Sequence, residues 1–240
     1  MLGGIYLQKG RRQPPQRFVF EGVPILCLPL HPGAGESARR LKRGEKQLKQ
    51  AGCRHLLLGE GIDPARLPLG HLPLVSALPL RRRLAVPAAL LLLEEAGVAT
   101  ARSTAALVAE CPTPRLFQQA AELSGHLRYL ALSFRRGGER FAFHLQRELG
   151  VSARLLQEGE LCPAQLVLLY ENCPAWEKQG TVNLPLYGES GRPWPVEYVT
   201  GEEEHPLFSC FDREKLLSHM LETGVLTEKK VKIRTKKQNT

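Results

Sequence analysis

The sequence predicts an α/β protein with a Rossmann-like, mostly parallel and doubly wound sheet, helices on both faces and a smaller C-terminal α/β appendage. Short apolar runs alternate with polar segments whose apolar residues recur every three or four positions, as in helices packed on a sheet. Three of these helical segments end at a glycine that precedes a new strand candidate, namely Gly52, Gly125 and Gly150. Strands separated by helices need crossover connections, which make neighbouring strands parallel.

The chain length and a change in composition suggest how the chain is divided. A length of 240 residues allows one large domain or two small ones. We expect an N-terminal strand pair over residues 1–20, a Rossmann-like α/β core over residues 21–170, and an appendage with one helix and a basic tail over residues 171–240. Residues 171–210 are rich in proline, glycine and glutamate and have only short strand candidates.

The first 100 residues predict strands and two helices. The expected strands cover residues 5–7, 17–20, 24–30 and 55–58. A narrow apolar stripe with basic residues around it predicts a helix over residues 37–51. Residues 72–80 contain several prolines and predict a connection, after which Pro87 fits the first turn of a buried helix ending at Gly97.

The remaining elements follow from the same patterns. Residues 98–101 predict a short strand and residues 103–110 a brief helix. Thr113 and Pro114 match a helix cap and first turn, so a helix is expected up to Ser124. The expected later strands cover residues 127–133, 151–156, 165–170, 181–186, 195–200 and 231–233, with helices over residues 138–149 and after Asp212.

The positive charge of the chain lies at its two ends. The formal net charge is +9, and residues 1–20 and 228–240 account for all of it. A nucleic-acid-binding domain usually has a basic face on the fold itself. Single-strand binders also place aromatic residues among the charges, and aromatics are only 6% of this chain. Nucleic acid or an acidic partner therefore stays open as an alternative.

Cysteine usage and hydropathy indicate the cellular compartment. The six cysteines show no C-x-x-C spacing, and the N-terminus lacks an apolar signal-peptide core, so we expect reduced thiols in the cytoplasm. The longest apolar run, Leu84–Leu93, is shorter than the roughly 20 residues that a membrane span needs. The histidines are dispersed without metal-ligand spacing, and we expect no metal site.

A first candidate site is the turn at residues 31–37, between a predicted strand and a predicted helix. Gly33 and Gly35 would let the backbone approach a ligand, and Ser37 stands where the helix begins. The turn is neither a Walker loop nor a complete G-x-G-x-x-G, and Glu36 would repel an anion. An ordinary strand-to-helix turn explains the same residues.

A second candidate site is the turn at residues 133–140. Gly137 and Gly138 open a predicted helix, and Glu158 follows twenty residues after Gly138, near the end of the next strand. Dinucleotide folds place a ribose-binding acid at about that distance. The segment resembles the cofactor turn of shikimate-dehydrogenase-like Rossmann domains, in which paired glycines open the helix. Phe134 and Arg135 stand where the first fingerprint glycine would be, and a solvated surface turn is the plainer interpretation.

Three functions remain open from the sequence. The first is a Rossmann-like module that binds a nucleotide or another phosphorylated small molecule at the glycine-containing turns. The second is a degenerate NAD(P)-dependent oxidoreductase that uses Gly137, Gly138 and Glu158. The third is a non-catalytic interaction protein with functional basic ends. The first two fit best if residues 31–37 and 133–140 share one sheet edge, because ligands bind at the carboxyl ends of parallel strands.

Overall fold

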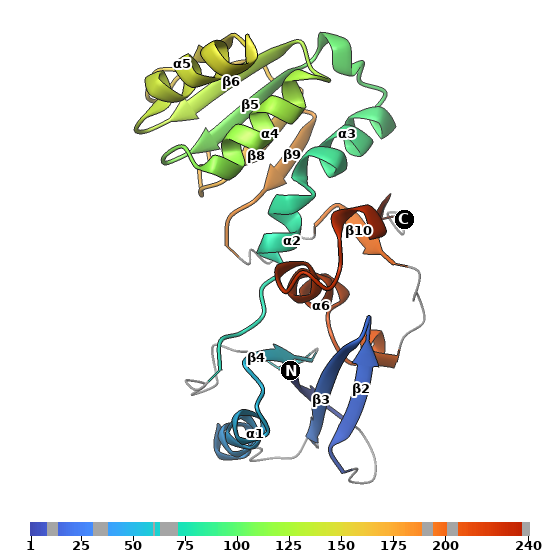
Figure 1. Cartoon of the computed structure of the whole chain (residues 1–240). Helices are drawn as coiled ribbons and strands as arrows, with labels where there is room; N and C mark the ends of the chain where they lie inside the picture. The colour runs from blue at the N-terminus through green and yellow to red at the C-terminus, as the bar shows by residue number, and fades with distance from the viewer. Residues whose placement is uncertain are drawn as a thin grey trace. The chain divides into compact units, whose positions relative to one another are not determined.

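A computed structural model describes residues 1–8, 14–30, 38–59, 61–62, 72–188, 194–200 and 206–236. The chain forms two compact units, Met1–Leu80 with Tyr198–Lys232, and Arg81–Glu197 with Ile233–Thr240 (Figure 1). This division differs from the expected boundaries at residues 20 and 170. The reason is that each unit has its own sheet, and that the first unit takes its last helix from the C-terminal segment.

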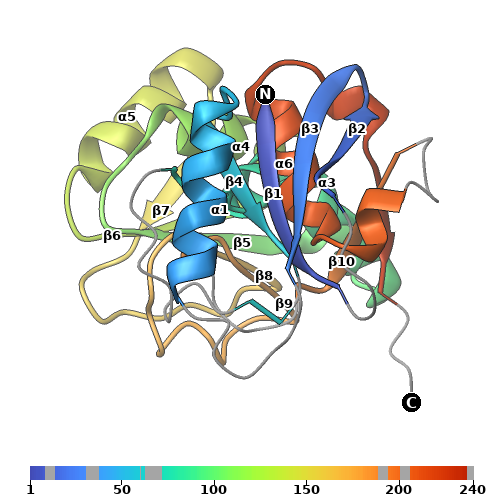
Figure 2. The ribbon, with the colours of Figure 1, turned by 90° about the horizontal axis from the view of Figure 1, so that it is seen from below.

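The first unit contains a four-stranded sheet in the order β2-β3-β1-β4 (Figure 2). Its strands are β1 Leu2–Leu7, β2 Gln16–Phe20, β3 Val23–Leu30 and β4 His55–Leu58. Strand β1 pairs parallel with β3 and with β4, and β2 pairs antiparallel with β3. Helix α1, Ala38–Gln50, connects β3 to β4, as its amphipathic stripe predicted.

Two adjacent glycines in β1 let both faces of this sheet pack closely. A Cβ on Gly3 would lie 3.0 Å from Leu48 Cδ1 of α1. A Cβ on Gly4 would lie 2.5 Å from Cζ of Phe211, whose ring covers the opposite face. Phe211 comes directly before helix α6, Arg213–Glu222, which follows the short 3₁₀ turn η3, Pro206–Ser209. Residues from both ends of the chain therefore build one core.

The second unit contains a five-stranded, fully parallel sheet in the order β7-β6-β5-β8-β9. The strands are β5 Thr104–Ala109, β6 Tyr129–Phe134, β7 Ala153–Leu155, β8 Leu166–Leu169 and β9 Val182–Pro185. The helices are α3 Ala85–Glu95, α4 Pro114–Ser124 and α5 Gly138–Leu149, with the short η2 Thr100–Arg102. The boundary between the two units falls within the short helix α2, Leu78–Arg83. The predicted α/β class and parallel sheet are confirmed.

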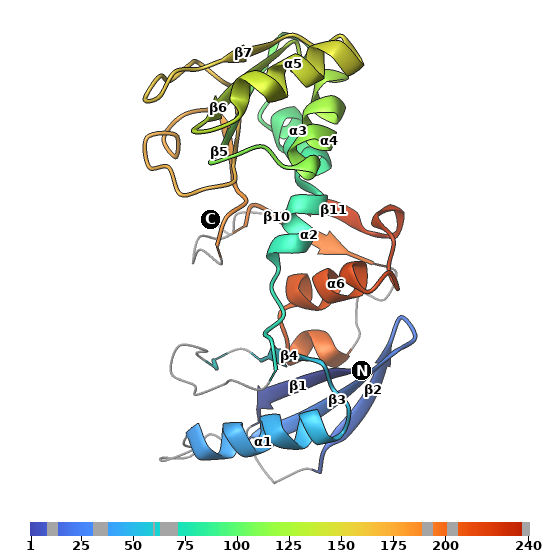
Figure 3. The same cartoon turned by 60° about the vertical axis from the view of Figure 1, so that its left-hand side comes forward.

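The two faces of this sheet are covered differently (Figures 1 and 3). Helices α3, α4 and α5 lie side by side on one face. The opposite face, around Val108 and Val167, packs against Leu156, Cys162 and Trp176, which come from connections without helices. The prediction of helices on both faces therefore does not hold for this sheet, because residues 156–165 and 170–181 form no helix.

The central strand is where sequence and structure differ most. Thr104–Ala109 forms β5, whereas the sequence predicted a helix over residues 103–110. The expected strand over residues 98–101 overlaps η2 instead. All residues of β5 after Thr104 are buried, so the strand shows no alternation of polar and apolar side chains. A short apolar run of this kind cannot be told from a buried helix by periodicity.

Two short strands complete the fold, β10 Val196–Val199 and β11 Lys232–Thr235, which form a two-stranded sheet. The 3₁₀ turn η4, Glu228–Lys230, precedes β11. The boundary between the two units falls within each of these strands, after Glu197 in β10 and after Lys232 in β11. Within the described ranges, every helix is too short or too polar to cross a bilayer.

Candidate functional site

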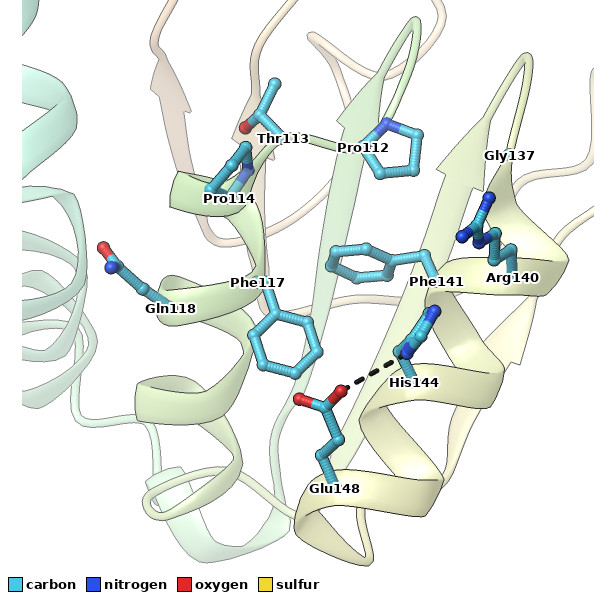
Figure 4. A pocket seen from close by; sticks show the side chains of 10 residues that line it. All are labelled: Pro112, Thr113, Pro114, Phe117, Gln118, Gly137, Arg140, Phe141, His144 and Glu148. Carbon is cyan, nitrogen blue, oxygen red and sulfur yellow. Dashed lines mark ion pairs between the residues drawn. The ribbon is translucent and has the colours of Figure 1, made fainter.

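A groove with a volume of about 590 Å³ lies between α4 and α5 on the helical face of the second unit (Figure 4). This volume is within the range of small-molecule sites. Its upper end is formed by Pro112, Thr113, Pro114, Gly137 and Arg140. Phe117 and Phe141 line the middle, and Gln118, His144 and Glu148 complete the lining further along the two helices.

The upper end forms because β5 and β6 are neighbours in register and end at the same sheet edge. The turns that follow them are joined by a hydrogen bond from the Arg136 amide to the Glu110 carbonyl at 3.0 Å. Helix α4 begins at the Thr113 cap, whose hydroxyl accepts from the Leu116 amide at 3.2 Å. Both helices therefore direct N-terminal N–H groups, and the positive ends of their dipoles, toward this edge.

The two predicted glycines of this turn have different roles. Gly137 caps α5 with a φ of 74°, a conformation that other residues rarely adopt, and it lines the groove. A Cβ at Gly138 would lie 2.5 Å from Leu155 Cδ1, so this buried glycine lets α5 begin close to β7. Gly138 therefore allows close packing of α5 against β7, while Gly137 belongs to the candidate site.

Of the arginines near the turn, Arg140 is the one that faces the groove. Arg135 pairs with Glu171, with 3.8 Å between Nε and Oε1, and Arg136 pairs with Glu110. These two arginines are therefore neutralised by acids that follow neighbouring strands. Arg140 is exposed and has no carboxylate partner among the residues that the structure describes.

The middle of the groove is aromatic. The rings of Phe117 and Phe141 lie edge to face, with centroids 5.9 Å apart and planes at 85°. Phe134 supports Phe141 from β6 in a similar arrangement at 5.1 Å. Phe141 is buried, whereas Phe117 is only half-buried. Neither ring was identified as a groove residue from the sequence.

The far end of the groove carries a histidine and a carboxylate. His144 Nδ1 lies 3.3 Å from Glu148 Oε1, one helical turn further along α5. Arg140, His144 and Glu148 are spaced by four residues and therefore share one helix face. This spacing is visible in the sequence, but a stripe of polar residues on a helix usually faces solvent, so it did not identify a site.

The direction of strand connection reverses between β5 and β8. The carboxyl ends of these two strands are a different location from the groove between α4 and α5. Beside this point Tyr170 donates from its hydroxyl to Gln119 Oε1. Gln119 Nε2 donates to the Arg82 carbonyl at 2.5 Å, and Arg82 Nε donates to the Leu186 carbonyl at 2.8 Å. Burial raises the pKa of the Tyr170 phenol above its usual value, although Arg82 lowers it. A hydrogen-bonded network occupies this location, and the groove lies beyond α4.

The first predicted site cannot be compared with this groove, because Gly33, Gly35 and Ser37 lie outside the described residues. The strand before them, β3, belongs to the four-stranded sheet, whereas residues 133–140 follow β6 of the five-stranded sheet. The expectation that the two turns share one sheet edge is therefore wrong. Its cause is the second sheet, which the sequence pattern did not separate from the first.

Glu158, the predicted ribose-binding acid, is exposed beyond β7 and does not line the groove. The acid with ordered contacts in that loop is Glu160. Its Oε2 accepts from the Gln157 amide at 2.9 Å, and its Oε1 lies 2.5 Å from Arg154 Nη2. The backbone hydrogen bond from Gln157, with a smaller contribution from Arg154, lowers the pKa of Glu160.

A metal centre is not apparent in the described part of the chain, where histidine, cysteine, aspartate and glutamate side chains form no cluster of three or more. What the groove offers is a cation and two helix N-termini at one end, two aromatic rings in the middle, and an imidazole–carboxylate pair at the other end. Comparison with models of protein families and with curated proteins finds no match for this chain.

Proposed function

We propose that the second unit is a Rossmann-like module that binds a phosphorylated small molecule in the groove between α4 and α5. Counted along this unit, the strands lie in the order third, second, first, fourth and fifth. That is the order of the first five strands of dinucleotide-binding folds. The strand order supports the fold and carries no function on its own, because function depends on the site.

The observation that carries the proposal is the upper end of the groove. Thr113, Gly137 and Arg140 bring two helix N-termini and an exposed guanidinium to one place at the carboxyl edge of the sheet. Backbone N–H groups at helix N-termini bind phosphate oxygens, and arginine donates to them in a fixed planar geometry. The phosphate of the ligand would lie between these groups, with the rest of the molecule along the groove.

Thermal denaturation with and without ligand tests this function. A ligand that binds only the folded protein stabilises it by about 2.7 kcal/mol at a concentration of 100 Kd. We expect ADP, AMP or ribose 5-phosphate at millimolar concentration to raise the melting temperature of the wild-type chain.

The substitution Arg140→Gln should remove most of this ligand-induced stabilisation, because it removes the charge-assisted hydrogen bonds to the phosphate. Arg147→Gln is the matched control, since Arg147 is exposed on the same helix and does not line the groove. Absence of any shift with phosphorylated compounds, or an equal loss in both variants, would contradict the proposal.

A further inference from the structure

We infer that the phosphorylated ligand of the groove is a nucleotide whose base carries an amino group. This inference rests on the proposed function and adds the identity of the other end of the ligand. It starts from the way the lining changes along the groove (Figure 4). Arg140 lies near Gly137 at one end, Phe117 and Phe141 face each other in the middle, and Glu148 stands at the other end.

The groove is long enough that a ligand filling it needs a phosphate at one end and a different group at the other. Arg140 and Glu148 are eight residues apart on α5, which corresponds to about 12 Å along the helix axis. A free phosphate or a phosphorylated sugar bound at Arg140 would leave the aromatic middle uncovered. A nucleoside monophosphate places its phosphate and its flat base at opposite ends of the molecule, so it can cover both parts.

The aromatic middle selects a flat ring. Phe141 is buried and contacts the rings of Phe117 and Phe134, so Phe117, which is half-buried, is the ring that a ligand can cover. A base stacked on an aromatic side chain gains enough affinity to change the dissociation constant by roughly fivefold or more. This contribution does not depend on which base is bound, because every base has a π-face.

The far end selects a hydrogen-bond donor. A carboxylate accepts hydrogen bonds and donates none. One oxygen of Glu148, Oε1, faces His144 Nδ1 at 3.3 Å, and the second oxygen remains as an acceptor beside the groove. The exocyclic amino group of adenine, guanine or cytosine can donate to it. A base edge that presents only acceptors would be repelled by the charge.

The experiment compares three compounds by isothermal titration with the full chain. They are AMP, purine riboside 5′-monophosphate, which lacks only the amino group of AMP, and ribose 5-phosphate, which lacks the base. We expect AMP to bind about tenfold more tightly than purine riboside 5′-monophosphate, because it makes a hydrogen bond to a charged group. We expect ribose 5-phosphate to bind most weakly.

Two variants connect these differences to individual side chains. Glu148→Ala should reduce the affinity for AMP to that for purine riboside 5′-monophosphate, and Phe117→Leu should bring both nucleotides toward ribose 5-phosphate. The controls are Glu122→Ala on α4 and Phe143→Leu on α5, both exposed and outside the groove lining. Neither control should change the order of affinities.

Each contrary outcome identifies what has failed. If ribose 5-phosphate binds as tightly as AMP, the nucleotide inference is overturned and the proposed function stands. If AMP and purine riboside 5′-monophosphate bind equally, or if Glu148→Ala leaves their difference intact, the amino-group assignment is overturned. If none of the three compounds binds, the proposed function itself fails, and this inference fails with it.

Discussion

Two histidine side chains of the first unit lie against each other, with ring centroids 5.0 Å apart. His219 is on the inner face of α6 and only 5% exposed, and His55 begins β4. Burial is the main reason that the pKa of His219 falls to about 4, and the positive charges of His55 and of the N-terminal amino group lower it further. The neutral ring is therefore the form that fits the folded state.

This shift predicts that the first unit loses stability as the pH falls from about 6.5 to about 4. Over that range His219 takes up a proton in the unfolded chain but not in the folded one, so acid favours unfolding. The loss is complete below the folded pKa, where both states are protonated, and amounts to at most ~3 kcal/mol. Urea denaturation at a series of pH values measures it.

The variant His219→Gln should flatten this pH dependence, because the side chain that binds the extra proton is gone. His144→Gln is the control, since His144 lies in the second unit and is partly exposed. A pH dependence that persists unchanged in His219→Gln would assign it to other groups.

Single elements show where local sequence determines structure. Helix α6 begins where the sequence predicted, because Asp212 Oδ1 accepts from the amides of Glu214 at 2.8 Å and Lys215 at 3.3 Å. Helix α5 runs from Gly138 to Leu149 as expected, and Gly150 ends it with a φ of 68°. Caps and glycine stops depend on chemistry within a few residues, which a sequence displays directly.

The cap of α6 supports a prediction about the first unit. Asp212→Ala removes the acceptor for two amides at the helix start and should lower the free energy of unfolding by about 1 kcal/mol. Asp212→Asn should cost much less, because asparagine is also a good cap. Denaturant titrations of both variants measure the difference, and an equal loss in the two would show that the charge, not the cap, matters.

Strand β5 shows where local sequence is insufficient. Its alanine-rich sequence, buried from Ala105 onward, has no signature of its own. Its identity as the central strand comes from pairing with β6 on one side and β8 on the other. For the same reason the groove could not be predicted from the sequence. Residues from α4 and α5 meet only because β5 and β6 lie side by side, so Phe117 and Phe141 could not be paired before β5 was recognised as a strand.

At the scale of the molecule, the two units differ in continuity. The second unit takes nearly all its residues from one stretch of chain, whereas the first combines the N-terminal sheet with α6 and Phe211 from near the C-terminus. A continuous stretch with its own core can fold by itself. Gly4, by contrast, has the Phe211 ring as its packing partner, and Phe211 lies outside any N-terminal fragment.

We therefore expect the fragment Arg81–Glu197 to fold alone and residues 1–80 alone not to fold cooperatively. The first fragment keeps the five-stranded sheet but loses the bonds from Thr235 to Glu95 at 2.5 Å and from the Lys236 amide to the Pro195 carbonyl at 3.1 Å, so it should melt at a lower temperature than the full chain. Circular dichroism melts measure both. Cooperative unfolding of residues 1–80 would contradict this account.

The amino-acid sequence by itself determined the α/β class, most helix boundaries and the placement of Gly137 at a strand-to-helix turn, because caps, glycine stops and amphipathic stripes act over a few residues. The tertiary structure decided the division into two sheets, the central position of β5, and which turns share a sheet edge. It also decided that Arg140, rather than Arg135 or Arg136, faces the groove. These features depend on strand pairing and on ion pairs between distant segments, and no local pattern in the chain encodes them.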